Sequence, residues 1–378
     1  MKTSTAVTND IRGTLYLAFE LGWKKWKLAF TVGRAQKPRL RSVDAGDTNA
    51  VKEEIEAARD RFKLAPNCRV LSCYEAGRDG FWLHRFLISA GVESLVVDSA
   101  SIEVSRRRRR VKTDRLDAQK LVNMLIRWDE GEQKVWSVAR VPSAEAEDAR
   151  HLHRELGTLK KEQTRLVNRI KGLLAGHGVR VTEIGKGFRE WLRQQRQWDG
   201  SPLPPGLGQR ALIEYDRLVL TRAQIAAIKR ERNRMLKSCE SRQAEVARKL
   251  TKLRAVGDSS GWTLSSELLS WREFHNRKEV GSIAGLTGTP YDSGGSDREQ
   301  GINKAGNKRV RALAVELAWC WVRHQPNSAL SQWYQRRFGA GGKRLRKIGI
   351  VALARKLLVA LWRWVDQDVL PEGALLKP

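Results

Sequence analysis

The stretch Thr14–Val32, TLYLAFELGWKKWKLAFTV, decides the fold of the first part of this chain. Apolar residues dominate two short runs within it, Thr14–Glu20 and Trp26–Val32, and a short connection containing Gly22 separates them. Two runs of this length and composition, joined by a tight turn, predict a pair of antiparallel strands. The first run ends on a carboxylate, that of Glu20.

The residues that follow extend this pair into an α/β domain. Further strands are predicted at Leu40–Asp44, Arg69–Glu75 and Ser94–Asp98, and helices are predicted at residues 51–62 and 81–90. The resulting order, three strands, a helix, a strand, a helix and a strand, predicts a mixed sheet with helices packed on it.

Four acidic residues are candidates for a metal site in this domain. Glu20 and Glu75 stand at the carboxyl ends of predicted strands, where α/β sheets usually place their sites. Asp114 and Asp117 are three residues apart at the start of a predicted helix, so they share one helix face. Carboxylates that converge repel one another unless cations lie between them, and Mg²⁺ prefers oxygen ligands. Two such ions can hold both sides of a phosphodiester.

Other interpretations of these charges remain open. The two aspartates could simply occupy a helix N-terminus, where acids are favoured. Asp98 also ends a predicted strand and competes for a ligand role, and Glu103 is a weaker rival. The five arginines Arg106–Arg110 form either a solvated charge run or a grip on a nucleic acid backbone.

The overall charge indicates a polyanionic partner. The 378-residue chain has a formal net charge of +29, and nucleic acid is the commonest partner for such an excess of cations. The first residues lack a secretory signal pattern, and four scattered cysteines suggest reduced thiols, so we expect a cytoplasmic protein. The most apolar run, Ile348–Val365, contains three cations and does not predict a membrane span.

The middle of the chain predicts a pair of long helices. Apolar residues from Ala149 to Leu173 alternate in steps of three and four over more than three heptads, with Gln163 at a core-type position. A second helical stretch is predicted at Gln209–Arg254, after a Pro- and Gly-rich loop at Asp199–Gly206. The pair either spaces two domains within one chain or forms a dimer seam.

A candidate nucleophile lies near the C-terminal end, in Tyr291–Asn307, YDSGGSDREQGINKAGN. We expect a Gly-rich loop between two helices, in which Ser293 precedes two glycines and a basic helix follows from Lys308. A hydroxyl on such a loop could attack a phosphate, although Gly-Ser loops are common as ordinary turns. Ser296 is the rival nucleophile.

Two separate motifs carry a resemblance to a known family. Residues 74–77, 80–83 and 112–118 resemble the N-terminal domain of the DEDD transposases of the insertion sequence 110 family, and residues 285–307 resemble their C-terminal domain. The resemblance covers nearly the full chain. It implies a ribonuclease-H-like (RuvC-like) domain at 1–140, a coiled-coil region at 141–252 with an insert around 180–208, and a helical transposase domain at 253–378.

The resemblance also implies a mechanism. Glu20, Glu75, Asp114 and Asp117 would bind Mg²⁺, and Ser293 would form a phosphoserine link with DNA. Many relatives have Asp where this chain has Glu20. Family members recombine donor and target DNA under the guidance of a structured non-coding RNA, the bridge RNA. A homodimer that assembles into a tetramer is expected, with each active site shared between protomers.

Two other function classes remain open from the sequence. The acids could activate water in a metal-dependent nuclease or a Holliday-junction resolvase-like enzyme, with Ser293 only a loop residue. Alternatively, the chain could be a non-catalytic RNA-binding or architectural protein. A covalent protein–DNA bond separates the recombinase from the nuclease, and Mg²⁺-independent behaviour would favour the architectural class.

Overall fold

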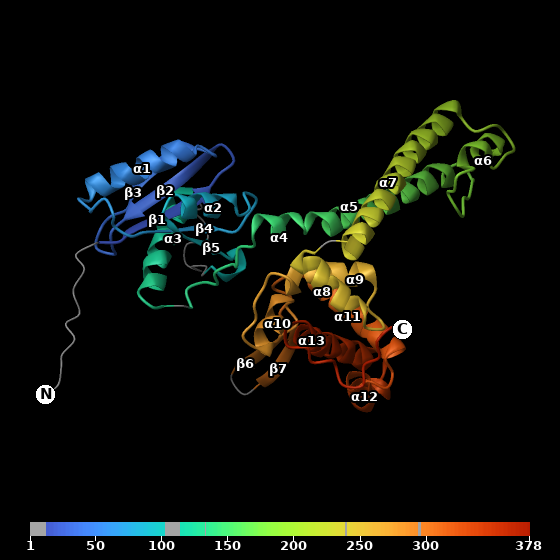
Figure 1. Ribbon diagram of the computed structural model, residues 1–378. Helices are drawn as coiled ribbons and strands as arrows, with labels where there is room; N and C mark the ends of the chain where they lie inside the picture. Colours follow the sequence, from blue (N-terminus) through green and yellow to red (C-terminus); the bar gives the residue numbers. More distant parts are fainter. Residues whose placement is uncertain (1–12, 103–113, 133, 239, 294–295) are drawn as a thin grey trace. The chain divides into compact units, whose positions relative to one another are not determined.

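The computed structural model describes residues 13–102, 114–132, 134–238, 240–293 and 296–378 (Figure 1). The chain divides into two compact units, Met1–Pro142 and Ser143–Pro378. The first unit is built on a mixed sheet with helices, and the second is almost wholly helical. This confirms the predicted combination of an α/β part and a helical part.

A five-stranded sheet forms the centre of the first unit, with the strand order β3-β2-β1-β4-β5. The strands are β1 (Leu15–Leu21), β2 (Lys25–Thr31), β3 (Arg39–Asp44), β4 (Val70–Glu75) and β5 (Glu93–Val97). β1, β2 and β3 pair antiparallel, whereas β4 and β5 run parallel to β1. All five predicted strands are present within one or two residues of their expected ends.

Helices cover both faces of this sheet (Figure 1). Phe19 of β1 belongs to the apolar cluster shared with α1 (Thr48–Arg61) and α2 (Trp82–Ser89). Its neighbour Ala18 belongs to the opposite cluster, which is shared with α3 (Asp114–Asp129). Because both faces are covered, the central strands β1 and β4 are mostly apolar along their length, whereas the edge strand β3 is mostly polar. A short 3₁₀ turn, η1 (Ser99–Ser101), follows β5.

The second unit begins with a long helical arm. Its helices are α4 (Ala144–Asp148), α5 (His151–Ala175), α6 (Phe188–Gln194) and α7 (Pro205–Ser238). α5 and α7 pack against each other along the arm (Figure 1). Four buried residues of α5 lie at positions with the predicted spacing: Leu156, Leu159, Leu166 and Ile170. The last buried position is Leu174 rather than Leu173.

The second long helix of the arm is shorter than predicted. A single helix was expected over residues 209–254, but α7 ends at Ser238 and α8 spans Arg242–Thr251. The Ser241 hydroxyl accepts a hydrogen bond from the backbone N–H of Ala244, which caps the new helix. Val246 and Leu250 of α8 pack into the C-terminal core, so their helical spacing did not belong to the arm.

The rest of the second unit is a helical bundle with one β-hairpin. Its elements are α9 (Asp258–Leu264), the π-helical turn η3 (Ser265–Leu269), α10 (Arg277–Ile283), β6 (Gly288–Ser293), β7 (Ser296–Ile302), α11 (Lys308–His324), α12 (Ala329–Tyr334), the π-helical turn η4 (Gln335–Gly339) and α13 (Lys343–Gln367). β6 and β7 pair antiparallel and form the hairpin seen in Figure 1.

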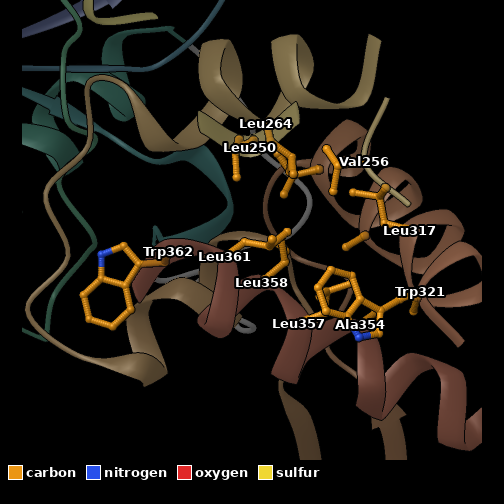
Figure 2. Close-up of a cluster of buried hydrophobic side chains, with 14 of the residues drawn as sticks. Leu250, Val256, Leu264, Leu317, Trp321, Ala354, Leu357, Leu358, Leu361 and Trp362 are labelled. Carbon is orange, nitrogen blue, oxygen red and sulfur yellow. The ribbon is translucent and has the colours of Figure 1, made fainter. Parts of the chain in front are cut away.

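The bundle core is organised around α13. Figure 2 shows Leu250 of α8, Trp321 of α11 and Leu357 of α13 among the side chains of this core. Trp321 is fully buried, and its indole Nε1 donates to the Ser328 hydroxyl at 2.9 Å. The apolar run at 348–365 therefore forms the central helix of a core. Among the described residues, none of the helices has the length and apolar character needed to span a membrane.

Candidate active site

Glu20 and Glu75 lie at the same level, near the carboxyl ends of two adjacent strands. β1 and β4 are parallel neighbours, and their register pairs Phe19 with Tyr74, one residue before each acid. Side chains alternate between the two faces of a sheet, so Glu20 shares a face with Ala18. Both acids therefore lie on the α3 face, since Ala18 and Cys73 both pack in the α3 cluster.

α3 runs in the opposite direction to β1 and β4. The Tyr16 hydroxyl, near the start of β1, donates to Asp129 Oδ2 at 2.8 Å, and Asp129 is the last residue of α3. Farther along, the Cys73 Sγ lies 3.8 Å from the backbone oxygen of Leu121. The N-terminal end of α3 is consequently at the edge of the sheet where Glu20 lies.

This direction brings the first turn of α3 to the level of the two glutamates. Asp117 precedes Leu121 by four residues, which is about 6 Å of helix. Glu75 follows Cys73 by two residues, which is about 7 Å of strand. Asp117 is half-buried, and it lies one turn from Leu121 on the helix side that faces the sheet. The structure thus brings Glu20, Glu75 and Asp117 to one edge.

Asp114 is the first residue of α3, one turn before Asp117, but its side chain lies outside the described residues. Within the described side chains, no group of three or more His, Cys, Asp or Glu residues is close enough to hold a metal ion. The acids at this edge supply only hard oxygen donors, which suit Mg²⁺. The chemistry of these side chains therefore suits Mg²⁺, and Asp114, whose side chain is not described, is the fourth candidate ligand.

The structure describes only one of the competing candidates, Asp98. Asp98 directly follows Val97, and Val97 packs on the α3 face. Strand alternation therefore directs Asp98 away from that face. Glu103 and the arginine run Arg106–Arg110 lie outside the described residues.

Lys27 is a neighbour of the acids that the sequence did not reveal. The register of β1 and β2 places it directly opposite Glu20, on the same face of the sheet. Directly opposed residues have Cβ atoms about 5 Å apart. Lys27 is half-buried and adds a cation beside the carboxylates. The signal in the sequence was the lysine that interrupts the apolar run of β2.

Ser293 lies at the end of β6, in the second unit. The expectation of a Gly-rich loop was wrong, because Gly288–Ser293 and Ser296–Ile302 pair as an antiparallel hairpin. Ser293 pairs with Ser296, so the two candidate serines lie opposite each other where β6 ends and β7 begins. The side chains of residues 290–300 lie outside the described part, and the hairpin does not choose between the serines.

The base of the hairpin is fastened by close backbone packing. Gly306 has φ +101°, and an added Cβ would lie 2.3 Å from the backbone oxygen of Ile283. Gly285 is equally tight against Ala305, where an added Cβ would lie 2.0 Å from the backbone oxygen. Only glycine allows these approaches, so these two positions fix where the hairpin leaves the bundle.

Comparisons with known proteins give the family. Residues 247–335 match the model of the IS116/IS110/IS902 family transposases, a segment that contains the whole hairpin. The chain is 40% identical to "Putative transposase y4rJ" of Sinorhizobium fredii over 99% of this chain and 97% of that protein. The chain belongs to the IS116/IS110/IS902 transposase family.

More distant relatives of this transposase have consistent names. It is 24% identical to "Transposase for insertion sequence element IS1111A" of Coxiella burnetii, over 66% of each chain. It is also 24% identical to "Transposase for insertion sequence element IS1328" of Yersinia enterocolitica, over 56% of this chain and 60% of that protein. The sequence-based recognition of the insertion sequence 110 family is confirmed.

The transposase also has a buried charged cluster around Glu267 of η3. The Glu267 carboxylate accepts two hydrogen bonds from Arg154, both at 2.8 Å, and lies 2.8 Å from His153 Nε2. Asn307 donates to the same carboxylate at 2.9 Å and also caps α11. The cluster joins the α5 arm to the segment that follows the hairpin.

The Glu267 cluster is electrostatically unusual. The side chain is only 1% exposed, and burial by itself raises the pKa of this carboxyl. The hydrogen bonds from Arg154, His153 and Asn307 outweigh burial and hold the pKa well below its ordinary range. The sequence did not reveal this cluster, because its partners lie as many as 114 residues apart.

Proposed function

We propose that this transposase cuts and rejoins DNA through a phosphoserine intermediate. Glu20, Glu75, Asp114 and Asp117 would hold Mg²⁺, and Ser293 would be the nucleophile. The observation that carries the proposal is the shared level and face of Glu20 and Glu75, with the first turn of α3 at the same edge. The strand order also supports a ribonuclease-H-like, RuvC-like domain.

The covalent step exchanges one phosphodiester bond for another. The Ser293 hydroxyl gives up its proton and its oxygen bonds to phosphorus, while the bond from phosphorus to a sugar oxygen breaks. That sugar oxygen takes up a proton and leaves as a hydroxyl. A different sugar hydroxyl can later attack the phosphoserine and release Ser293, so the number of phosphoester bonds is conserved. Bound Mg²⁺ would stabilise charge on the phosphate oxygens.

The protein's own residues have distinct roles in this proposal. Glu20, Glu75 and the two aspartates orient the scissile phosphate by holding the ion. Lys27, opposite Glu20, offers a positive charge to a neighbouring phosphate. The hairpin carries the nucleophile, and Gly285 and Gly306 fix its base. The acids and Ser293 belong to different units, and we propose that one protomer supplies the acids and another the serine.

The remaining partners are part of the same proposal. The +29 charge supports simultaneous binding of donor DNA, target DNA and a structured guide RNA. The long helix α7 exposes three large apolar side chains, Ile213, Val219 and Leu220, and these support a homodimer that assembles into a tetramer. We propose that the protein acts in the cytoplasm, where the DNA is accessible.

A covalent adduct tests the proposal most simply. The full-length protein is incubated with element-end DNA, the non-coding RNA transcribed from the element, and Mg²⁺, and is then denatured and analysed on a gel. A DNA-linked protein band is expected for wild type and for Ser296→Ala, and should be absent for Ser293→Ala. DNA cleavage by Ser293→Ala without an adduct would instead support a nuclease that uses activated water.

A further inference from the structure

A large groove runs along α13 in the second unit. We call it the α13 groove; it is bounded by α10, α12, α13 and the base of the hairpin, and its volume is about 1170 Å³. This exceeds the range of about 300 to 1,000 Å³ of sites for small ligands. The groove is therefore large enough for a segment of a polymer.

The rim of the α13 groove is strongly basic. Seven of its lining residues are Lys or Arg, among them Lys304, Arg355 and Arg363, whereas Glu372 is the only acid among the lining residues that the structure describes. Within the same described set, none of these seven cations forms an ion pair with a carboxylate. A concave surface lined by one sign of charge attracts a polyanion.

Arg355 is held in a defined position rather than projecting freely. It lies against α10 at Gly281, where an added Cβ would come within 2.8 Å of Arg355 Nε. The absence of a side chain at Gly281 leaves room for the guanidinium group to cross the helix. This packing places a cation on the groove wall.

The floor of the α13 groove is apolar. Val351 and Val359 of α13 lie beside Leu330 and Trp333 of α12, and Ile348 is 52% exposed at one end. Lys356 Nζ lies 4.7 Å from the centre of the Trp333 ring. Val351, Val359, Leu330 and Trp333 are only partly buried against the bundle core, and the rest of their apolar surface lines the groove.

An apolar floor with a basic rim matches single-stranded nucleic acid. Unpaired bases stack on aromatic surfaces and pack on aliphatic ones, while their phosphates contact cations. In a duplex the faces of the bases are covered by their neighbours, so such a floor would gain little from paired DNA. The groove thus favours an unpaired strand.

The hairpin indicates which strand this is. Gly288 of β6 and Gly301 of β7 both line the α13 groove, and Ser293 lies at the other end of the same hairpin. We propose that the α13 groove binds an unpaired DNA strand next to the phosphate that Ser293 attacks. This inference rests on the proposed function, because it uses Ser293 as the attacking residue.

A binding experiment tests the charges. Full-length Ser293→Ala protein without divalent metal is titrated into a fluorescent 12-nucleotide DNA strand at fixed salt, and anisotropy is measured. The double change Lys347→Glu and Arg363→Glu should weaken binding at least tenfold. Arg323→Glu with Arg336→Glu is the matched control, since it changes the net charge equally at exposed positions outside the groove, and should weaken binding less than threefold.

Cross-linking tests the floor without altering the groove. The same Ser293→Ala protein is irradiated with a strand containing 5-iododeoxyuridine, and the cross-linked peptide is identified by mass spectrometry. A cross-link to the peptide that contains Trp333 is expected. Cross-links only outside the groove, equal affinity for the duplex form, or tighter binding of the RNA strand of the same sequence would each overturn the proposal.

The outcomes separate this inference from the proposed function. Binding is measured without metal and without the nucleophile, so it does not depend on covalent chemistry. If wild type forms the adduct but the groove variants bind the strand like the control, the groove assignment is wrong and the recombinase stands. If the groove binds the strand but no adduct forms, the recombinase proposal fails and the groove assignment as a single-strand site remains.

Discussion

Glu20 and Glu75 lie at the same level near the carboxyl ends of two neighbouring parallel strands, since Phe19 pairs with Tyr74 one residue before each carboxylate. Two carboxylates in this arrangement repel each other unless a cation lies between them. The N-terminal turn of α3 adds Asp117 at the same edge. The proposed Mg²⁺ site depends on this arrangement, and the first two predictions test it.

The activity should depend more on the charge of the side chain at position 20 than on its length. Glu20→Gln removes the negative charge and is expected to abolish DNA cleavage and adduct formation. Glu20→Asp keeps the charge but is one methylene shorter, so it should retain activity with a higher Mg²⁺ requirement. A Mg²⁺ titration of adduct formation measures both effects. Wild-type activity in Glu20→Gln would remove this residue from the site.

Asp117 and Asp98 provide a matched comparison. Mutation of residues that only hydrogen-bond to metal ligands typically lowers metal affinity or activity about 10- to 100-fold. Loss of a direct ligand should cost more, so Asp117→Asn should reduce adduct formation more than about 100-fold. Asp98→Asn is the control, because strand alternation directs Asp98 away from the α3 face, and its effect should be small. The rate of adduct formation is measured for both variants and compared. An equal loss in both variants would argue against the assignment of Asp117.

The Glu267 cluster should stabilise the second unit. Glu267→Gln leaves Arg154 without its carboxylate partner, and breaking a buried ion pair costs about 3–5 kcal/mol. Urea unfolding measures the change in the free energy of unfolding. Glu231→Gln is the control, since it breaks an exposed pair with Arg234 of the kind that contributes little. A loss no larger than that of the control would show that the cluster has no structural role.

The same cluster predicts a dependence of stability on pH. The pKa of Glu267 is lower in the folded protein than its ordinary value near 4.5. The unfolded chain therefore binds more protons at acid pH, and stability falls as pH is lowered. The contribution of Glu267 is complete above pH 4.5 and decreases below it. Thermal melting of wild type and Glu267→Gln should converge from pH 7 towards pH 3, and a constant difference would contradict this account.

Much of the first unit could be predicted because its signals are local. The apolar run that ends at Glu20 forms a strand by its own composition, and β4 ends on Glu75 for the same reason. The direction of α3 relative to the strands could not be predicted from the spacing of residues in the sequence. It depends on contacts such as Tyr16 with Asp129, which are 113 residues apart in the chain.

The second unit was less predictable for a related reason. The hairpin sequence is polar and Gly-rich, which is typical of a loop, yet its strands pair and close packing at Gly285 and Gly306 holds their base. The apolar residues Val246 and Leu250 continue the helical spacing of α7 in the sequence, but in the structure they belong to the bundle core. Helical periodicity identifies a buried face without showing which neighbour covers it.

The central claim is that acids from one protomer and Ser293 from another complete a single site. Two inactive variants, Asp117→Asn and Ser293→Ala, are co-expressed with different tags, and mixed oligomers are purified through both tags. The account predicts that the mixed oligomers form the DNA adduct on the Asp117→Asn chain, which carries the intact serine, while neither variant alone does so. Mixed oligomers that bind DNA but form no adduct would contradict it.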